Sequence, residues 1–249
     1  GVDDFTIEAC RFEQWAGAGI AMVGCHRGQV SGCSFHHDSD VPAGHGVQLK
    51  GGSKSIEITR CFFTGFAHRW VNIGGTSLRS VFRPPDARYE AEDVTIEGNR
   101  FVGGNAAVVW SAARGGVVRG NTIYQPREWI CRIMQEGPDG IDPCRDGVFE
   151  RNLVVYDGRA LRELIQKRRG ADWSSFAFRE NAWFDVAGER YPRYRPWAHW
   201  LTPSFEDLPA EETGGVYGVD PELIDAGGPT MRVGNSSLTK HFPSGRIGA

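Results

Sequence analysis

The sequence repeats one short phrase seven times at a constant internal spacing. The phrase is an apolar residue, two others, a cysteine or asparagine, one other residue and a second apolar residue. Steps between successive marked positions are 23, 28, 38, 22, 31 and 29 residues, by subtraction of those positions. A constant core with unequal steps predicts one structural unit per copy, with loops of different length. The marked residues are Cys10, Cys33, Cys61, Asn99, Asn121, Asn152 and Asn181.

The copies are predicted to be β-strands that stack as a solenoid. Apolar residues alternate within them, as at Val94 and Ile96, which is the period of a strand. Further short apolar strands are predicted at 19–23, 46–50, 70–73, 107–110 and 129–133. Strands that pair with their copies above and below form a parallel β-helix. A β-sandwich would also supply short strands, but it would not keep one residue at one offset seven times.

The marked position is expected to lie at a bend, where stacked copies are about 4.8 Å apart. Asparagine suits a bend because it tolerates left-handed backbone and its amide can bond the next rung, which predicts an asparagine ladder. Cys10, Cys33 and Cys61 occupy the same position, so we expect stacked buried thiols. Their spacing alone leaves disulfides between neighbouring rungs open. The other three cysteines lack zinc-site spacing.

Two stretches, VTIEGNRFVGG and VVRGNTIYQP, resemble the repeat of right-handed parallel β-helix proteins of the pectin-lyase-like superfamily. The resemblance covers about residues 2–184. We therefore predict an all-β fold: a right-handed, single-stranded parallel β-helix of about seven rungs over 1–184. An irregular extension rich in proline and aromatic residues, 185–249, is expected to pack on it or cap it. The resemblance also implies a polysaccharide or oligosaccharide partner and an extracytoplasmic location.

Composition adds several exclusions. Lys plus Arg total 28 against 31 Asp plus Glu, a net charge of −3, which favours neither nucleic acid nor a membrane surface as partner. No apolar run reaches the roughly 18 residues of a membrane span, and no stretch resembles a signal peptide. Residues 2–12 enter a rung without a capping segment. We expect that face to contact an upstream segment or another chain, and favour the former.

Strand alternation selects one outer row of side chains. Val47 and Leu49 take the inward positions, so Gln48 and Lys50 are predicted to point outward. The same alternation in the next rung predicts an outward Asn72, stacked on Gln48.

Other candidates flank this row. Trp70 shares the parity of Asn72 and is also predicted to point outward, while His68 and Arg69 lie where that strand begins. If Ile133 stacks on the rung of residue 73, Arg132 extends the row.

Two loops carry further polar groups. Residues 36–46 concentrate histidine and aspartate, which suits a metal or substrate loop, although a solvated polar turn is the simpler interpretation. Residues 76–93 would supply cations and a tyrosine to a cleft if they fold beside Lys50; the alternative is a solvated loop with paired charges. This loop contains Arg79, Arg83, Arg88, Tyr89, Glu90 and Glu92.

The family resemblance implies chemistry on acidic polysaccharides, and β-elimination from a uronate is the favoured hypothesis. It needs a base for the proton α to the carboxylate, and cations or donors that neutralise the carboxylate. The candidate bases are Lys50, His68 and Tyr89. Candidate substrate-binding residues are His45, Gln48, Arg69, Asn72, Arg83 and Arg132.

Closer matches within the superfamily are partial. Lys50-Gly51-Gly52-Ser53 is similar to the region where alginate and chondroitin lyases carry a catalytic lysine, with an arginine one rung later. Here Asn72 stands in that strand instead, and the calcium-binding acidic cluster of those enzymes is not evident. We therefore predict neither a metal nor another cofactor, with Ca²⁺ implied only by the family.

Two alternatives stay open. Gly44-His45-Gly46 is similar to a polygalacturonase motif, and Arg132-Ile133 to part of another, but the aspartate motifs of those glycoside hydrolases are missing. A non-catalytic glycan-binding or structural module of a larger cell-surface protein is the other alternative.

Overall fold

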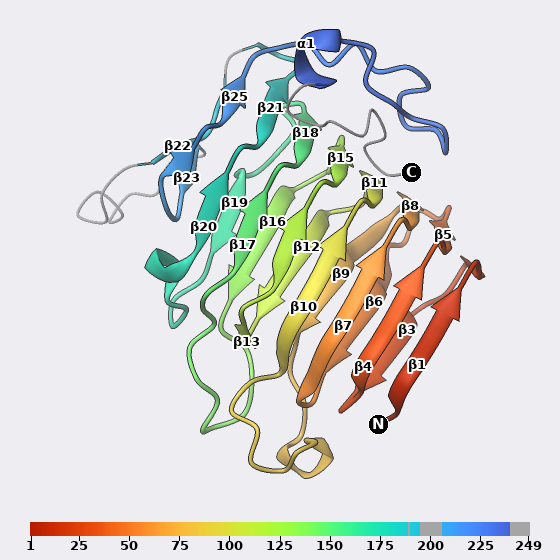
Figure 1. The fold of residues 1–249 in the computed structure, drawn as a ribbon, viewed down its shortest axis with the longest axis vertical. Coiled ribbons are helices and arrows are strands. Elements are labelled where there is room, and N and C mark those ends of the chain that lie inside the picture. Colours follow the sequence, from red (N-terminus) through yellow and green to blue (C-terminus); the bar gives the residue numbers. More distant parts are fainter. Residues whose placement is uncertain (189, 195–205, 240–249) are drawn as a thin grey trace.

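The computed structural model describes residues 1–188, 190–194 and 206–239, and it is a parallel β-helix (Figure 1). Three parallel sheets follow one another around each turn. The first sheet faces the viewer in Figure 1 and runs from β1, in red, toward the blue end of the chain. Its strands are β1 (Asp3–Glu8), β4 (His26–Ser31), β7 (Ser53–Thr59), β10 (Ala91–Glu97), β14 (Val117–Arg119), β17 (Val148–Glu150), β20 (Ala177–Arg179) and β24 (Glu212–Thr213), with β13 (Ala113–Arg114) beside β10.

The other two sheets complete each rung. The second sheet contains β2 (Arg11–Glu13), β5 (Ser34–His37), β8 (Phe62–Gly65), β11 (Arg100–Gly103), β15 (Thr122–Tyr124), β18 (Leu153–Tyr156), β21 (Ala182–Asp185) and β25 (Val216–Tyr217). The third sheet contains β3 (Ala18–Val23), β6 (Ala43–Lys50), β9 (Ala67–Gly74), β12 (Ala106–Ser111), β16 (Trp129–Met134) and β19 (Ile165–Lys167). The predicted all-β parallel β-helix is confirmed.

The repeated phrase marks the bend between the first and second sheets. The residue just before each marked position has left-handed backbone, for example φ 53° at Arg60 and 61° at Gly120. That conformation turns the chain within one residue. The marked side chain then lies buried inside the bend, and Cys10 in the first rung is the exception.

Asparagine amides link the bends of successive rungs. Nδ2 of Asn99 donates to Oδ1 of Asn121 at 3.0 Å, and the bonds from Asn121 to Asn152 and from Asn152 to Asn181 have the same length. Asn181 donates to Oε1 of Glu212 at 3.1 Å, so a carboxyl group ends the column. Because these groups are buried, each bond satisfies atoms that water cannot reach.

Stacked aromatic rings fill the interior beside this column. The rings of Phe35 and Phe63 lie 4.6 Å apart, and those of Phe63 and Phe101 lie 4.9 Å apart. Cys33 and Cys61 are buried as predicted, whereas Cys10, in the first described rung, is exposed. All six cysteines are free thiols, so no disulfide links neighbouring rungs.

The predicted outward orientation of Trp70 is wrong. Its ring is fully buried, tilted against Phe63 at 5.9 Å, and its indole N–H donates to the carbonyl of Gly103 at 3.0 Å. Glycines make the room: a Cβ on Gly104 would lie 2.5 Å from the indole nitrogen. Trp70 and the next residue, Val71, are both core residues, so strict alternation fails at this point of the strand.

Part of the C-terminal extension continues the solenoid. β24 pairs with β20, and β25 pairs with β21, while β22 (Arg193–Tyr194) and β23 (Asp207–Leu208) pair with each other. Three short helices are described, η1 (Arg79–Val81), η2 (Trp173–Ser175) and α1 (Ser236–Thr239). Within the described ranges no helix has the length and apolarity needed to cross a membrane. At the other end, β1, β2 and β3 are edge strands, and contact of that face with further chain stays a prediction.

Candidate functional site

The outer surface of the third sheet, which we call the third-sheet face, carries most of the predicted site residues. Gln48 pairs in register with Asn72, Asn72 with Val109, and Val109 with Arg132. Gln166 follows Arg132 on β19. The predicted row is therefore present in register, with Val109 interrupting it, but Asn72 is fully buried and its amide donates to the carbonyl of Gly74 at 3.0 Å.

The floor of the face around β12 and β16 is apolar. Ala106, Val109, Trp129 and Met134 form a buried cluster that is separate from the main core. The guanidinium of Arg132 lies over the Trp129 ring at 4.3 Å. An apolar floor lowers the local dielectric and so strengthens the charges around it.

Two arginines and one carboxylate meet above this floor. Arg69 Nη1 lies 3.7 Å from Oε2 of Glu136 and donates to Oδ1 of Asn72 at 3.4 Å. Nε of Arg132 donates to Gln166 at 2.6 Å, and the charges of Arg69 and Glu136 both act on Arg132. Burial lowers the pKa of Arg69, and burial followed by the charge of Arg69 lowers the pKa of Arg132 to about 10.

Arg69 is the arginine that pairs with Glu136, whereas Arg132 feels the charges of Glu136 and Glu128 without an ion pair to either among the described residues. The side chain of Glu136 is 35% exposed, and its Oε2 also accepts a bond from the Ser111 hydroxyl at 3.2 Å. The long Arg69–Glu136 contact and the unpaired Arg132 leave positive charge uncompensated, which is the property of an anion-binding site.

His45 lies beside Arg69, its register partner on β9. Its Nδ1 is buried and has no hydrogen-bond partner among the described residues. Burial, followed by Arg69, Lys50 and His68, lowers the pKa of His45 to about 4. The imidazole is therefore neutral near neutral pH, and three predicted site residues act on it electrostatically.

Lys50 and His68 are at the margins of the face. The backbone of Gly75 passes over the Lys50 stem, since a Cβ on that glycine would lie 3.7 Å from Cδ of Lys50 and 3.1 Å from Nε2 of Gln48. His68 is exposed, and its Nδ1 lies 3.3 Å from Nδ2 of Asn105. The charges of both candidate bases act on His45.

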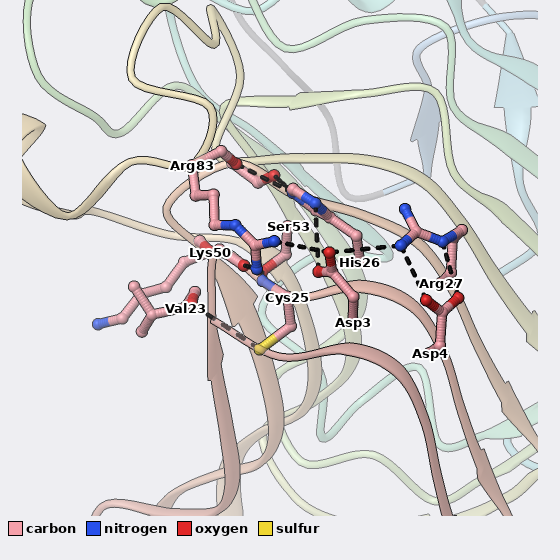
Figure 2. Close-up of polar contacts among 11 residues, drawn as sticks. Asp3, Asp4, Val23, Cys25, His26, Arg27, Lys50, Ser53 and Arg83 are labelled. Atoms are coloured by element: carbon pink, nitrogen blue, oxygen red, sulfur yellow. Dashed lines mark hydrogen bonds and ion pairs between the residues drawn. The ribbon is translucent and has the colours of Figure 1, made fainter.

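The structure does not bring Arg83 to the third-sheet face. Its guanidinium binds Asp3 at 2.6 Å and the carbonyl of Gly24 at 3.3 Å, and its own carbonyl accepts a bond from His26 (Figure 2). Figure 2 shows the Lys50 side chain extending away from this cluster. Arg83 therefore fastens the 76–93 loop to Asp3 and Gly24 of the first rung.

Tyr89 is also placed elsewhere. It is 7% exposed, and Arg114 of the first sheet lies over its ring at 4.8 Å. Burial, followed by the charge of Glu92, raises the pKa of Tyr89 to about 12, which suits packing better than proton transfer. The expectation that this loop adds a tyrosine and a cation to the face is therefore wrong for Arg83 and Tyr89.

Sequence reasoning missed three groups of the site: Ser111, Glu136 and Gln166. A signal existed for Glu136, since it lies four residues after Arg132 and so continues the outward parity of Arg132 just beyond β16. Ser111 and Gln166 could not be chosen, because their place depends on the register of β12 and β19.

The histidine-rich insert is divided between two places, since His45 lies on the third-sheet face while its first half lines a separate cavity. This cavity, of about 370 Å³, is lined by His37, Asp38, Ser39, Asp40, Gly65, Phe66 and Arg127. Across the described ranges, no group of three or more His, Cys, Asp or Glu side chains is arranged to hold a metal ion.

Chemically, the third-sheet face combines two partly buried guanidinium groups, amide donors, a neutral imidazole and a lysine. These groups can bind a carboxylate through charge-assisted bonds and contact the hydroxyls of a sugar. Hydrolysis would need two carboxyl groups across the scissile bond. Glu136 is the carboxylate that pairs with Arg69, whereas Glu128 is bound by Arg162 at 3.0 Å.

Comparison with protein families supports the architecture. The family model described as the right-handed beta helix region matches residues 1–162. A search of curated proteins gave no match.

Proposed function

Because the chain belongs to the right-handed beta helix family and bears two partly buried arginines with little carboxylate around them, we propose that its third-sheet face binds an acidic polysaccharide and cleaves it by β-elimination. The observation that supports the proposal is the incomplete neutralisation of Arg69 and Arg132, since Glu136 pairs with Arg69 at 3.7 Å and Arg132 has no ion pair among the described residues. A uronate carboxylate fits there because it can replace or supplement that glutamate as counter-ion.

The proposed step keeps atoms and electrons in balance. Arg69 and Arg132 neutralise the uronate carboxylate, which makes the proton on the adjacent carbon more acidic. Lys50 takes that proton; the electron pair forms the carbon–carbon double bond as the bond to the leaving oxygen breaks. The leaving oxygen then receives a proton, which Lys50 in its ammonium form supplies.

Lys50 is preferred over His68 as base for a structural reason. It lies on the same strand as Gln48 and His45, at the outward parity that faces a chain bound along the row. His68 is exposed and engaged with Asn105.

The test is to incubate the protein with alginate, pectate and glycosaminoglycans and to follow the ultraviolet absorbance of the unsaturated uronate. We expect absorbance to rise with at least one polymer, and Lys50→Ala to abolish the rise. Lys54→Ala is the matched control, because Lys54 pairs with Glu92 on the first sheet at 2.8 Å.

Other outcomes separate the alternatives. Binding of a polyuronate without unsaturated product would leave a glycan-recognition module as the function. New reducing ends without absorbance would indicate hydrolysis instead. If the experiment detects neither binding nor cleavage, the proposed function on acidic polysaccharides is wrong. The extracytoplasmic location that we propose with that function would then lose its support.

A further inference from the structure

We infer that His45 acts as a neutral hydrogen-bond donor through Nε2, directed at the carboxylate of the bound uronate. The inference rests on the proposed function and extends it, because it assigns a chemical role and a tautomer to a residue at its centre. Three observations carry it: the buried Nδ1, the charges around the ring and the register with Arg69.

The environment of Nδ1 determines the tautomer. Nδ1 is buried without a hydrogen-bond partner among the described residues. A proton on Nδ1 would create a buried donor with no acceptor, whereas an unpaired acceptor nitrogen costs less. In the neutral ring the proton therefore belongs on Nε2, and the partly exposed side chain leaves that nitrogen as the one able to meet a ligand.

The groups around the ring disfavour the charged form. β9 contributes Arg69 in register and the neighbouring His68, and β6 itself contributes Lys50. On the other side, β3 places Ala18 in register, which carries no charge. No carboxylate among the described residues acts on the His45 ring, and Glu136 is paired with Arg69 at 3.7 Å.

Trp15, in the connection between β2 and β3, holds the backbone of β6 at His45 and does not contact the imidazole through a hydrogen bond. The indole N–H of Trp15 donates to the main-chain carbonyl of His45 at 2.6 Å. The imidazole is thus held on a strand whose backbone is anchored on both sides.

A neutral donor in this place has a defined effect on the elimination. As the proton leaves the carbon, negative charge moves onto the carboxylate oxygens, and a bond from Nε2–H strengthens without transferring its proton. The same tautomer excludes His45 as the base, since a base would need its lone pair on Nε2 and its proton on the buried Nδ1.

The first test reads the tautomer directly. Nitrogen NMR on the histidine-labelled full chain is expected to show His45 neutral, protonated on Nε2, near neutral pH. Loss of the signal in His45→Gln assigns it. An imidazolium, or a neutral ring protonated on Nδ1, would overturn the inference whether or not the protein cleaves any polymer.

The second test compares His45→Gln with His45→Ala on the polyuronate that the protein cleaves or binds. Glutamine can present an amide N–H near the position of Nε2–H and alanine cannot. For cleavage we expect about 10²-fold or greater loss of kcat in the alanine variant, the scale of a lost oxyanion donor, and substantial rescue by glutamine. Circular dichroism checks that both variants fold.

Titration calorimetry with short pectate or alginate oligomers completes the design. In buffers of different ionisation enthalpy the apparent binding enthalpy should agree, because His45 takes up no proton. Proton uptake that disappears in His45→Gln would overturn the inference while leaving the proposed function intact. Absence of both binding and cleavage would overturn the proposed function, and NMR would still decide the tautomer.

Discussion

Among single residues, the balance of charge above the apolar floor is the property on which the site depends. Arg69 and Arg132 are both partly buried, and both lie within range of one carboxylate, Glu136. Burial raises the free-energy cost of an uncompensated guanidinium, so these side chains gain most when a second anion arrives. Glu136 thus competes with a ligand for the same cations.

Replacing Glu136 tests this competition. We expect Glu136→Gln to bind short oligouronates roughly 3- to 10-fold more tightly, about 1 kcal/mol for a partly exposed charge. Titration calorimetry at fixed ionic strength measures it. Glu13→Gln serves as control, because Glu13 pairs with Arg11 on the second sheet. Unchanged or weaker binding by Glu136→Gln would contradict the assignment of Glu136 as a competing anion.

At the scale of elements, the loop between β9 and β10 is fastened to the solenoid by a buried carboxylate. Glu90 is fully buried and accepts bonds from the Gly51 N–H at 2.8 Å, the Ser77 N–H at 2.7 Å and the Ser77 hydroxyl at 2.7 Å. Arg83 adds a second attachment at Asp3. The loop therefore closes the edge of the third-sheet face without supplying the base or cation that its sequence suggests.

Glu90→Gln should loosen this loop. An amide NH₂ would face donors that now meet carboxylate oxygens, leaving at least one buried donor unsatisfied at a cost of about 1–3 kcal/mol. Urea unfolding measures the loss, and limited proteolysis should show faster cleavage within 76–89. The exposed ion pair of Glu97 with Arg119 offers a control, since Glu97→Gln should cost less than about 1 kcal/mol. Equal stability of the Glu90→Gln and Glu97→Gln variants would argue against the role of Glu90 in fastening the loop.

The asparagine column gives a second prediction at this scale. Glu212 accepts bonds from both the main-chain N–H and the side-chain amide of Asn181, at 3.0 and 3.1 Å, and burial raises its pKa. A carboxyl whose folded pKa is raised stabilises the fold at low pH and loses that contribution as pH rises through the folded pKa.

Glutamine at position 212 keeps an acceptor oxygen without the charge. Its NH₂ group would face the indole N–H of Trp183, which now donates to Oε2 of Glu212 at 3.3 Å, and this lowers the stability of the variant equally at every pH. The stability of Glu212→Gln relative to the parent should nevertheless increase from acid to neutral pH, because only the parent acquires a buried charge over that range. Unfolding free energies across a pH series test the sign, and a relative stability that falls from acid to neutral pH would refute the argument.

At the scale of the whole molecule, the exposure of each cysteine thiol depends on the rung in which it lies. Cys10 is exposed in the first rung, whereas the other five cysteines are buried. Burial raises the pKa of Cys61 and of Cys144 to about 12, so thiolate is scarce at those sites. Thiolate is the reactive form, and burial also blocks access to reagents.

Alkylation of the native protein should accordingly modify Cys10 alone. Intact mass after iodoacetamide treatment is expected to increase by one adduct, with six adducts in denaturant. The thermal unfolding midpoint should not depend on reducing agent, since no disulfide is present. Rapid native labelling of Cys61 would indicate that the rungs open far more readily than their burial implies.

The sequence predicted more of the fold than of the candidate site. The phrase predicted the rungs and the bend, and it placed Gln48, Asn72 and Arg132 in one row, because parallel in-register stacking repeats a sequence offset in space. Alternation failed at Trp70, where glycines in adjacent rungs admit two successive inward residues. Arg83 and Tyr89 were misplaced because a loop has no period from which its contacts can be read.

The sequence by itself determined the architecture, since a repeated bend residue and alternating apolar positions leave few other ways to bury the apolar side chains and satisfy the buried amides. Only the tertiary structure decided which polar groups meet. Arg69 and Arg132 lie on strands two rungs apart, and the loop after β16 brings Glu136 to Arg69. That meeting depends on loop paths and side-chain reach, which are set by packing across rungs and not by the repeat.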